Sequence, residues 1–422
     1  MASITQTDAV MFRIPHALLA LAAVAAIALT AWQMPKLPSV LPAPYATPSS
    51  DNRPTVIEKP ENAQLHVPRG FIVQVWASGF SRPRFLLQGA KGEILLSDSG
   101  KGVTGIASPY SRASDGSVYV FPEGDPAQRK VLIRGLNRPY GLALWQNYLY
   151  VGQADSIKRY LYDPDTLTVG PGQEVISLAG FNQGHWTRSL LFDREGKKLY
   201  VGIGSGANVE TGEDPRRAAI NRYNPDGSGH ELFATGTRNP IGLNWYPDTD
   251  ALWATVQERD ELGDDLVPDY FTHIEEGAFY GWPYSYIGRH LDPRIEDQRP
   301  GLVAKAKVPD VLLPAHVAVL DFVFYTGKMF PSEYQLGAFL AFHGSWNRSR
   351  RGGYEVAFIP FSNAQPSGTP RDFMTGWMLA PDRKQVWGRP VAVFQMTDGS
   401  LLVTDDGAGT IWRVAYAGGP RG

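Results

Sequence analysis

Short alternations of apolar and polar residues fill the chain from about Gly70 onward, and turns rich in Gly, Pro, Asn and Asp separate them. A side-chain period of two is typical of β-strands, whereas amphipathic helices show a period near 3.6 over a longer stretch. No long stretch of the helical period occurs in this part of the chain. The pattern therefore predicts a mostly β protein with little helix.

One unit recurs along the chain: a Pro or Arg, an apolar strand, a turn of the Asp-x-x-Gly kind, and a second strand that ends in small or polar residues. Five copies start at Arg82, Arg138, Arg188, Asn239 and Arg389, and a degenerate sixth lies between His316 and Ser345. The starts are roughly 50 to 75 residues apart, which suits a four-stranded propeller blade. The strand FIVQVWA after Gly70 is expected to close the ring.

We predict an all-β, six-bladed β-propeller over residues 67–418. The alternative is a β-sandwich with meandering loops, but a sandwich does not require the same hairpin six times. In a propeller, the residues just before and after each hairpin surround one mouth of the central channel. We therefore expect the functional site at those positions.

The N-terminus has a different pattern. Arg13 and His16 precede an apolar run from Ala17 to about Trp32, as in an export signal. This run is longer than many signal-peptide cores but shorter than a full membrane span, so residues 1–34 are expected to form either a cleaved signal peptide or a retained anchor helix. Residues 35–66 are dense in Pro, Ser and Asn and indicate an extended linker. The expected location is the periplasm, secreted or tethered to the inner membrane.

The composition limits the classes of binding partner that the protein is expected to have. The chain has 40 basic and 42 acidic residues, so no net field favours nucleic acid or an anionic membrane surface. It has no cysteine, which excludes disulfides, thiolate metal ligands and cysteine nucleophiles. A small-molecule partner fits this composition best.

His185 precedes the third hairpin in FNQGHWTRSLLF, where the chain would enter an innermost strand. Histidine has the one side chain whose unperturbed pKa lets it accept a proton near neutral pH, which abstraction from a sugar hydroxyl requires. The alternative is a structural histidine, and His230, His316 and His343 are competing candidates for the base.

Arg238 and Asn239 stand at the start of the fourth hairpin in TGTRNPIGLNW. Arginine offers a planar fork of donors for carboxylates and quinone oxygens, and asparagine adds a donor and an acceptor. Ligand binding and a hydrogen-bond network that locks the blades both remain open for this pair.

An acidic turn, VQERDELGDDLVPDYF, follows the fourth hairpin. Its carboxylates would repel one another, and a hard cation such as calcium would relieve that repulsion with carboxylate and carbonyl ligands. The spacing differs from the EF-hand loop, so a solvated acidic turn remains the alternative. The acidic residues are Glu258, Asp260, Glu261, Asp264, Asp265 and Asp269.

Basic and aromatic residues gather in HGSWNRSRRGGY and in WGRP near the C-terminus. Arg348 and Arg389 could bind an acidic cofactor, and Trp346 or Trp387 could stack on a flat ring. Packing within a blade is the alternative explanation for either tryptophan.

Several motifs occur in one order: GHWTRSL, GTRNPIGL, ERDELGDDLVPDY, YGWPYSY, HGSWNR, GRPVAV and VTDDGAGTIWRV. Over Gly70 to Tyr416 the chain thereby resembles the glucose/sorbosone dehydrogenase family, soluble sugar dehydrogenases that use pyrroloquinoline quinone (PQQ), and most of all its sorbosone dehydrogenase branch. The fold of that family, a six-bladed propeller, agrees with the repeat count.

The resemblance implies an oxidoreductase that oxidises an aldose or a sugar-derived aldehyde or alcohol, with PQQ and calcium as cofactors. It implies that His185 is the base and that Arg238 stabilises charge on the quinone oxygen. Asn239 and Arg389 match cofactor-contacting positions, and Arg348 replaces a basic residue that contacts the cofactor carboxylates. Calcium would lie against the acidic turn. A respiratory-chain quinone or cytochrome would accept the electrons.

Three departures from the soluble glucose dehydrogenase pattern argue against glucose as the substrate. Ile241 replaces a glutamine, Gly184 replaces an acid before the histidine, and Asp260–Glu261 replaces a Gly-Pro pair. A calcium-dependent lactonase and a non-catalytic binding propeller are the alternative functions. A lactonase would not need the arginine cluster formed by Arg238, Arg348 and Arg389.

Overall fold

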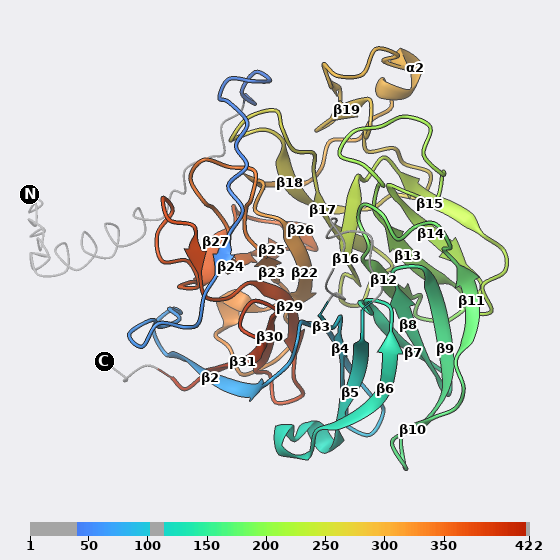
Figure 1. Cartoon of the computed structure of the whole chain (residues 1–422), viewed down its shortest axis with the longest axis vertical. Helices are drawn as coiled ribbons and strands as arrows, with labels where there is room; N and C mark the ends of the chain where they lie inside the picture. The colour runs from blue at the N-terminus through green and yellow to red at the C-terminus, as the bar shows by residue number, and fades with distance from the viewer. Residues whose placement is uncertain (1–39, 102–113, 419–422) are drawn as a thin grey trace, which may run out of the picture. The chain divides into compact units, whose positions relative to one another are not determined.

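Six sheets of four or five strands make up the body of the protein (Figure 1). The structure is a computed structural model, and it describes residues 40–101 and 114–418. The innermost strands of successive sheets contact one another around a ring, and β29 contacts β3 to complete it. The predicted all-β, six-bladed propeller is confirmed. The predicted signal or anchor helix, residues 1–34, lies outside the described residues.

Within each blade the chain runs from the innermost strand outward. From inside to outside the blades are β3(Pro83–Gln88), β4(Ile94–Asp98), β5(Gly116–Phe121), β6(Lys130–Leu136); β7(Leu142–Trp145), β8(Tyr148–Gln153), β9(Ser156–Asp163), β11(Gln173–Ser177) with β10(Thr168–Val169); β12(Arg188–Phe192), β13(Leu199–Ile203), β14(Ala219–Tyr223), β15(Glu231–Thr235); β16(Asn239–Trp245), β17(Leu252–Gln257), β18(Pro268–His273), β21(Val311–Ala315); β22(Val319–Phe324), β23(Ala338–Phe342), β24(Glu355–Ile359), β27(Arg371–Met374); and β29(Pro390–Gln395), β30(Leu401–Asp405), β31(Thr410–Tyr416), β2(Phe71–Ser78).

Short elements lie in the connections. They are β1(Thr55–Val56), β19(Ser285–Tyr286), β20(His290–Leu291), β25(Phe361–Ser362), β26(Gln365–Pro366), β28(Gln385–Val386), the helix α2(Pro300–Val303) and three 3-10 turns at Pro122–Gly124, Pro126–Gln128 and Ser332–Tyr334. Among the helices in the described ranges, none is long and apolar enough to cross a bilayer.

Each repeat found in the sequence is the inner hairpin of one blade. The copy at Arg82 becomes β3 and β4, and the degenerate copy after His316 becomes β22 and β23. The strand FIVQVWA is β2, which pairs antiparallel with β31 and joins the two ends of the propeller in one sheet. Successive residues of an inner strand point to opposite faces of its sheet. Both faces pack against a neighbouring blade, which explains why the repeated hairpins are rich in apolar residues.

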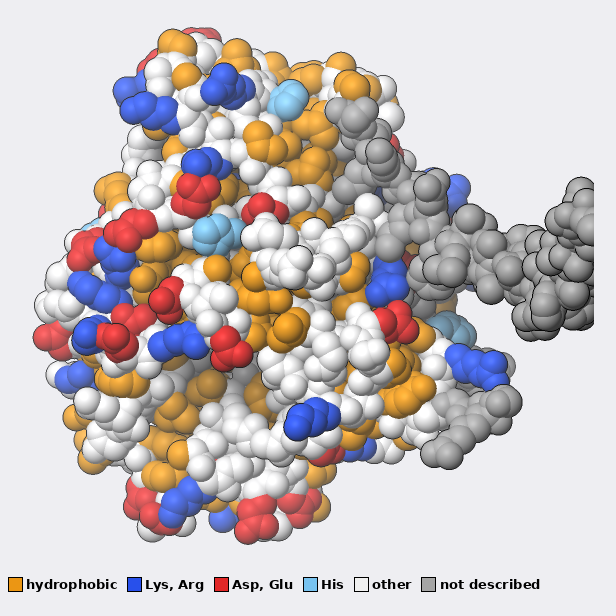
Figure 2. Space-filling view, turned by 180° about the vertical axis from the view of Figure 1, so that it is seen from behind, with side chains coloured by type: hydrophobic (Ala, Val, Ile, Leu, Met, Phe, Trp, Pro, Cys, Tyr) orange, Lys and Arg blue, Asp and Glu red, His pale blue; other side chains and the backbone are white. Residues whose placement is uncertain are grey.

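The core lies between neighbouring sheets, where aromatic and β-branched side chains interdigitate. Between the fourth and fifth blades, Trp253 packs on Phe271 with ring centroids 4.8 Å apart, and Phe322 meets Phe271 edge-on at 4.7 Å. Basic and acidic side chains are interspersed over the face drawn in Figure 2. The charges on that face therefore form no block of a single sign.

The segment that we predicted as a linker runs along the propeller from residue 40 to residue 66. Thr55–Val56 pairs in parallel with Gln385–Val386, and His66 bridges to Thr375. We call residues 40–66 the strap. The boundaries predicted at residues 34 and 66 stay predictions, but the described part of this segment is bound to the blades rather than free.

Asp405, at the end of β30, accepts several hydrogen bonds that stabilise the sixth blade. Its fully buried carboxylate accepts the indole N–H of Trp377 at 2.7 Å and of Trp412 at 3.1 Å, the backbone N–H of Arg389 at 2.7 Å, and two further backbone N–H groups. Asp405→Ala leaves these donors unpaired, so we expect the free energy of unfolding to fall by about 3 kcal/mol or more. Denaturant melts should show this, with the exposed Asp382→Ala as control. An equal effect of both changes would contradict it.

Candidate functional site

The predicted site residues lie at one end of the blades. Each stands just before or at the start of an innermost strand, or after the second strand of a blade, and antiparallel pairing brings those two strand ends to the same edge of a sheet. His185 and Arg238 precede β12 and β16, Arg389 precedes β29, and Asp260 follows β17. Because these positions are equivalent in successive blades, the side chains lie around one mouth of the channel.

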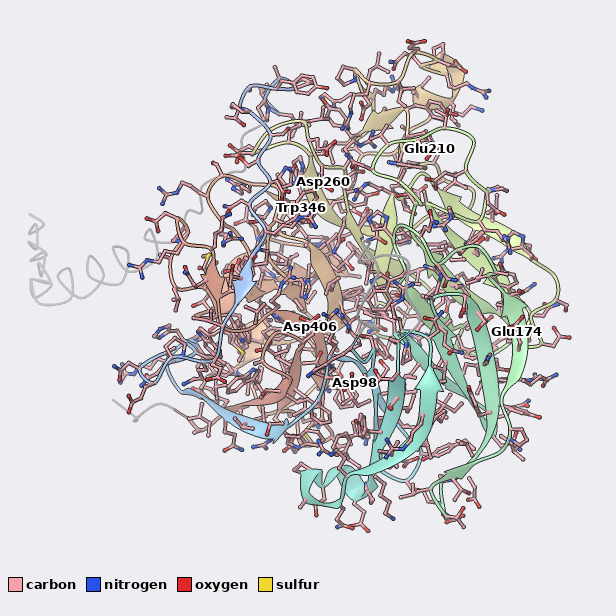
Figure 3. All side chains as sticks on the ribbon, viewed as in Figure 1. Asp98, Glu174, Glu210, Asp260, Trp346 and Asp406 are labelled. Carbon is pink, nitrogen blue, oxygen red and sulfur yellow. The ribbon has the colours of Figure 1, made fainter. Side chains whose placement is uncertain are left out.

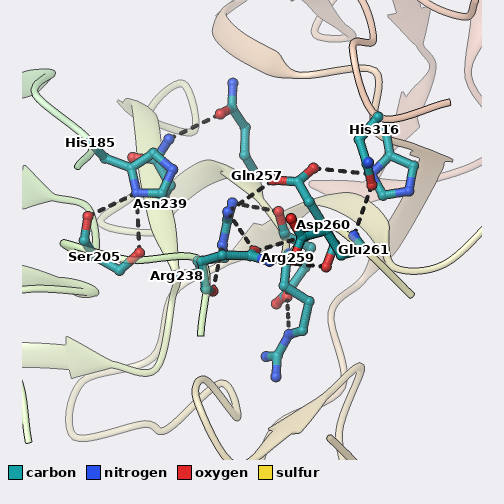
Figure 4. A network of polar contacts seen from close by, with 12 residues as sticks. His185, Ser205, Arg238, Asn239, Gln257, Arg259, Asp260, Glu261 and His316 are labelled. Atoms are coloured by element: carbon teal, nitrogen blue, oxygen red, sulfur yellow. Dashed lines mark hydrogen bonds and ion pairs between the residues drawn. The ribbon is translucent and has the colours of Figure 1, made fainter. Parts of the chain in front are cut away.

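His185 is held by its backbone and by one ring nitrogen (Figure 4). Its Nδ1 lies 2.9 Å from the carbonyl oxygen of Ser205 and 3.1 Å from the Ser205 hydroxyl, which itself donates to the Ala207 carbonyl at 2.6 Å. A carbonyl oxygen can only accept, so Nδ1 carries the proton and Nε2 of the neutral ring carries the lone pair. Arg188, fully buried, donates to the His185 carbonyl at 2.8 Å and fixes the backbone.

Burial, followed by the nearby positive charge of Arg238, lowers the pKa of His185 to about 3. The imidazole is therefore neutral at any pH well above that value. A neutral ring with a bare Nε2 is the form that accepts a proton.

This shift predicts a pH effect on stability. The unfolded chain takes up the proton near pH 6.5 and the folded chain near 3, so acidification through this window favours unfolding. Relative to His185→Gln, the wild type should lose up to about 1.4 kcal/mol of unfolding free energy per pH unit between these limits. Denaturant melts of both proteins from pH 7 to pH 4 test this. A pH-independent difference between the two would show that His185 titrates alike in both states.

Asn239 lies against the same turn as His185. A Cβ on Gly204 would come within 2.2 Å of Asn239 Oδ1 and 2.5 Å of His185 Cβ, so these two side chains close over a position that only glycine fits. Asn239 Nδ2 donates to Gln257 Oε1 at 3.0 Å, whereas the buried Oδ1 has no partner in the described part of the chain. An orphaned buried acceptor indicates that a donor from outside the described chain belongs here.

Arg238 is buried and spreads its guanidinium over three acceptor residues. Nη1 donates to the Glu258 carbonyl at 2.5 Å, Nη2 lies 3.1 Å from Asp260 Oδ2, and the other contacts go to Asn208. His316 Nδ1 lies 3.3 Å from the other oxygen of Asp260. Although burial opposes it, His316 and Arg238 hold the pKa of Asp260 below its usual value. Burial likewise opposes the charged His316, but Asp260 raises the pKa of that imidazole.

Arg389 lies in a second cluster at the same mouth. Its Nε and Nη2 donate to the carbonyl oxygens of His343 and Gly344 at 3.1 and 3.3 Å, and it forms no ion pair within 4.0 Å among the described residues. His343 Nε2 contacts Asp406 at 2.8 Å, and Arg84 pairs with Asp406 at 2.6 Å. The guanidinium of Arg389 therefore supplies a positive charge that no carboxylate of the described chain contacts.

Trp186 joins the two clusters, because it follows His185 in the chain and lies 5.1 Å from the Arg84 guanidinium. In Figure 3, Asp406 lies near the centre of the ring, and Asp260 and Trp346 lie farther out, among the loops. Glu261 N donates to Asn347 Oδ1 at 2.8 Å, so the loops of Asp260 and Trp346 meet.

The side chains of three predicted residues are directed away from the His185–Arg238 cluster. Arg348 pairs with Asp265 at 2.6 Å, and Trp346 contacts Arg53 of the strap, whose guanidinium lies 5.1 Å from its ring. The Glu258 side chain is turned into the fourth blade, where Arg259 binds one oxygen at 3.0 Å and both side chains are 0% exposed. The structure does not bring these three side chains together with His185 or Asn239.

The predicted calcium ligands do not form a cation cage by themselves. Among the described residues, no three His, Asp or Glu side chains gather at metal-binding distances. Asp260 is shared by Arg238 and His316, its carbonyl accepts from Arg294 at 2.9 Å, and the Glu261 carboxylate accepts from Asn208 at 3.3 Å. This donor set does not fit a calcium ion held by the protein alone.

Sequence reasoning missed Ser205 and Asn208, which bind the side chains of His185 and Arg238. Both lie in GSGANVE, directly after the third hairpin, which is a position where the repeat itself predicts channel-mouth residues. The position was therefore available from the sequence, but a small polar residue in a Gly-rich turn gives no chemical signal of its own.

Fold and site together define a six-bladed propeller with a histidine and buried arginines at one mouth of its channel. Comparison with known proteins gives the family. The model of the TrAA12-like family matches residues 65–269 and 301–417. The chain belongs to the TrAA12-like family, and its predicted likeness to PQQ-dependent sugar dehydrogenases is confirmed.

Two curated relatives and one solved structure illustrate the likeness. An uncharacterized protein of Borreliella burgdorferi is 28% identical, with 86% of this chain and 93% of that protein covered. The PQQ-dependent pyranose dehydrogenase of Coprinopsis cinerea is 23% identical, and this chain covers 55% of its length. The holo PQQ domain of that pyranose dehydrogenase superposes with a TM-score of 0.71 at 20% identity, over 86% of this chain and 99% of the domain. That superposition shows the shared fold.

Proposed function

We propose that this protein is a PQQ-dependent dehydrogenase that oxidises a sugar, an aldose or a sugar-derived aldehyde or alcohol, with His185 as the general base. The observation that carries the proposal is the neutral His185 ring, whose Nε2 carries the lone pair; His185 and Asn239 lie against the same glycine at the channel mouth, and the charge of buried Arg238 acts on the ring. Its relatives include a PQQ-dependent sugar oxidoreductase, which supports the same class.

The residues fit an acidic, oxygen-rich cofactor. Arg389 brings a positive charge with no carboxylate partner in the described chain, and buried Asn239 Oδ1 has no donor. Arg238 uses four of the five guanidinium N–H groups on protein oxygens, so one N–H on Nη1 remains for a ligand oxygen. Arg389 would bind a cofactor carboxylate, and Arg238 and Asn239 would contact the ring oxygens and ring nitrogen.

When bound, PQQ would supply the two-electron acceptor for the hydride that leaves the sugar carbon. His185 Nε2 accepts the hydroxyl proton of the same carbon, and Nδ1–H, anchored on Ser205, keeps the ring in that orientation. Arg238 would direct its remaining N–H toward the oxygen on which negative charge develops, and its hydrogen bonds to the Asn208 and Glu258 carbonyls hold the guanidinium in place.

Calcium stays a prediction that needs a different donor set. Asp260 and Glu261 are the predicted ligands at the site, whereas Glu258 is committed to Arg259. Any calcium here would need oxygens from a ligand in addition to those of the chain. No step of the mechanism above depends on it.

Export to the periplasm and transfer of the electrons to a respiratory quinone or cytochrome are part of the proposal. Support for export comes from the apolar run after Arg13 and His16. In the periplasm, a sugar-oxidising enzyme could pass its electrons to a quinone or cytochrome of the respiratory chain. Fractionation of cells that produce the tagged full chain tests the location.

Cofactor titration tests the function. The purified full chain is mixed with PQQ, with and without calcium, and assayed for sugar-dependent dye reduction. We expect stoichiometric uptake and reduction. Uptake without reduction by any sugar would reject the sugar-oxidising activity, and lactone hydrolysis by a protein that takes up no PQQ would favour the lactonase.

A further inference from the structure

Asn208 connects the two halves of the candidate site. It lies in the loop after β13, half-buried, and it contacts both Arg238 and the Asp260–Glu261 turn. Within the site, its hydrogen bonds are to Arg238, Asp260 and Glu261 and not to His185. We propose that Asn208 is a positioning residue that holds the Arg238 guanidinium and the Asp260–Glu261 turn in one fixed arrangement; the inference rests on the proposed function.

On the arginine side, Asn208 supplies two acceptors. Its carbonyl oxygen accepts from Arg238 Nε at 3.2 Å, and its side-chain Oδ1 accepts from Arg238 Nη2 at 3.0 Å. Two acceptors on one edge of a planar fork fix both the position and the rotation of the guanidinium. The same carbonyl also accepts the indole N–H of Trp282 at 3.0 Å, which anchors the loop itself.

On the turn side, the same amide binds three groups. Oδ1 accepts the backbone N–H of Asp260 at 2.9 Å, and Nδ2 donates to the Asp260 carbonyl at 3.1 Å and to Glu261 Oε2 at 3.3 Å. A carboxamide offers a donor and an acceptor at once, which neither a carboxylate nor a hydroxyl at this reach would do for both partners. Asn208 therefore binds the turn through both its side-chain N–H groups and its side-chain oxygen, and it binds Arg238 through oxygen acceptors alone.

The Asp260–Glu261 turn has a strained backbone, which contacts from neighbouring residues must stabilise. Glu261 adopts φ +74°, a left-handed conformation that an L-residue other than Gly adopts at a cost. Asn208 bonds to both residues of the turn, and Asn347 accepts the Glu261 N–H at 2.8 Å from the other side. Without the Asn208 side chain, the arginine would keep its contacts to Glu258, Asp260 and the residue 208 carbonyl, but it would lose the second acceptor on the edge that orients its remaining N–H.

Two substitutions separate the two roles. Asn208→Ala removes the side-chain contacts to both partners. Asn208→Asp keeps an acceptor for Arg238 Nη2 but sets an oxygen against the Asp260 carbonyl and the Glu261 carboxylate. Asn147→Ala, in the exposed turn between β7 and β8, is the matched control.

The first readout uses the protein without cofactor. Arginine ¹⁵N NMR of the full chain, with Arg238 assigned through Arg238→Lys, reports how fast the guanidinium rotates. We expect slow rotation in the wild type, in Asn208→Asp and in the control, and faster rotation in Asn208→Ala, which loses one of the four acceptors of the guanidinium. Equal rotation in wild type and Asn208→Ala would overturn the proposal, whether or not PQQ binds.

The second readout is the PQQ dissociation constant from titration. We expect it to rise at least about tenfold in Asn208→Ala and in Asn208→Asp, because a hydrogen bond to a charged group is lost or the turn is repelled. Melting temperatures identify a variant that merely fails to fold. Failure of the wild type to take up PQQ would count against the proposed function, whereas unchanged affinity in a folded Asn208→Ala would count against Asn208.

Discussion

Replacing His185 by Gln is expected to lower sugar-dependent dye reduction by about two to four orders of magnitude, the usual contribution of a general base. Glutamine can keep a donor toward Ser205, so the fold and PQQ uptake should change little. The loss should appear in kcat, because the base acts on the reacting proton rather than on binding. Steady-state kinetics with a saturating cofactor measure it.

The matched control is His290→Gln, which changes an exposed histidine in the short β19–β20 hairpin. We expect wild-type rates for that variant. A His185→Gln protein that binds PQQ and turns over at the wild-type rate would remove His185 from the mechanism. His316 or His343 would then have to be tested as the base.

Replacing Arg238 by Met should have two large effects, because this side chain serves both the fold and the ligand. The substitution leaves His316 as the ion-pair neighbour of Asp260, and it removes the hydrogen-bond donors of the Glu258 and Asn208 carbonyls. Breaking such a buried pair costs roughly 3–5 kcal/mol of unfolding free energy. We also expect PQQ uptake to disappear.

A double substitution separates these effects. Arg238→Met with Asp260→Asn removes the unpaired carboxylate, so part of the lost stability should return while PQQ uptake stays absent. Denaturant melts and cofactor titration of the two single variants and the double variant measure both quantities. Recovery of uptake in the double variant would show that Arg238 acts only by neutralising Asp260.

The fold was predictable because it repeats. One hairpin pattern recurs often enough that the copy after His316, which is degenerate, could be placed from its neighbours, and the closing strand after Gly70 followed from the ring. Period-two alternation indicates a strand with one buried face, whereas inner-hairpin strands such as β4, β13 and β23 are buried on both faces, so the recurring hairpin and its turn residues carried the prediction.

In the candidate site, closeness to a repeated strand predicts where a residue lies, but it does not always fix the direction of the side chain. His185 and Arg238 stand within three residues of β12 and β16, so their direction follows from the blade. Glu258 directly follows β17 and Arg348 lies in the loop after β23, but local ion pairs decide the direction of both side chains: Arg259 holds the first and Asp265 the second. No sequence period encodes such pairs.

The strap shows the same limit. Its composition indicated an extended linker, but composition does not indicate which surfaces the segment contacts. Asn52 donates to the carbonyl oxygens of Arg348 and Ser349 at 3.0 Å, and Thr47 accepts from Asp264 N at 2.7 Å. Because these contacts reach the loops of the candidate site, functional measurements should keep residues 40–66.

The most direct test of the central claim is a titration of the purified full chain with PQQ, followed by absorbance, with a panel of aldoses added to the loaded protein. The account predicts uptake of one PQQ per chain and a spectral change on adding sugar that is lost in His185→Gln. A folded wild-type protein that takes up no PQQ, with or without calcium, would contradict it.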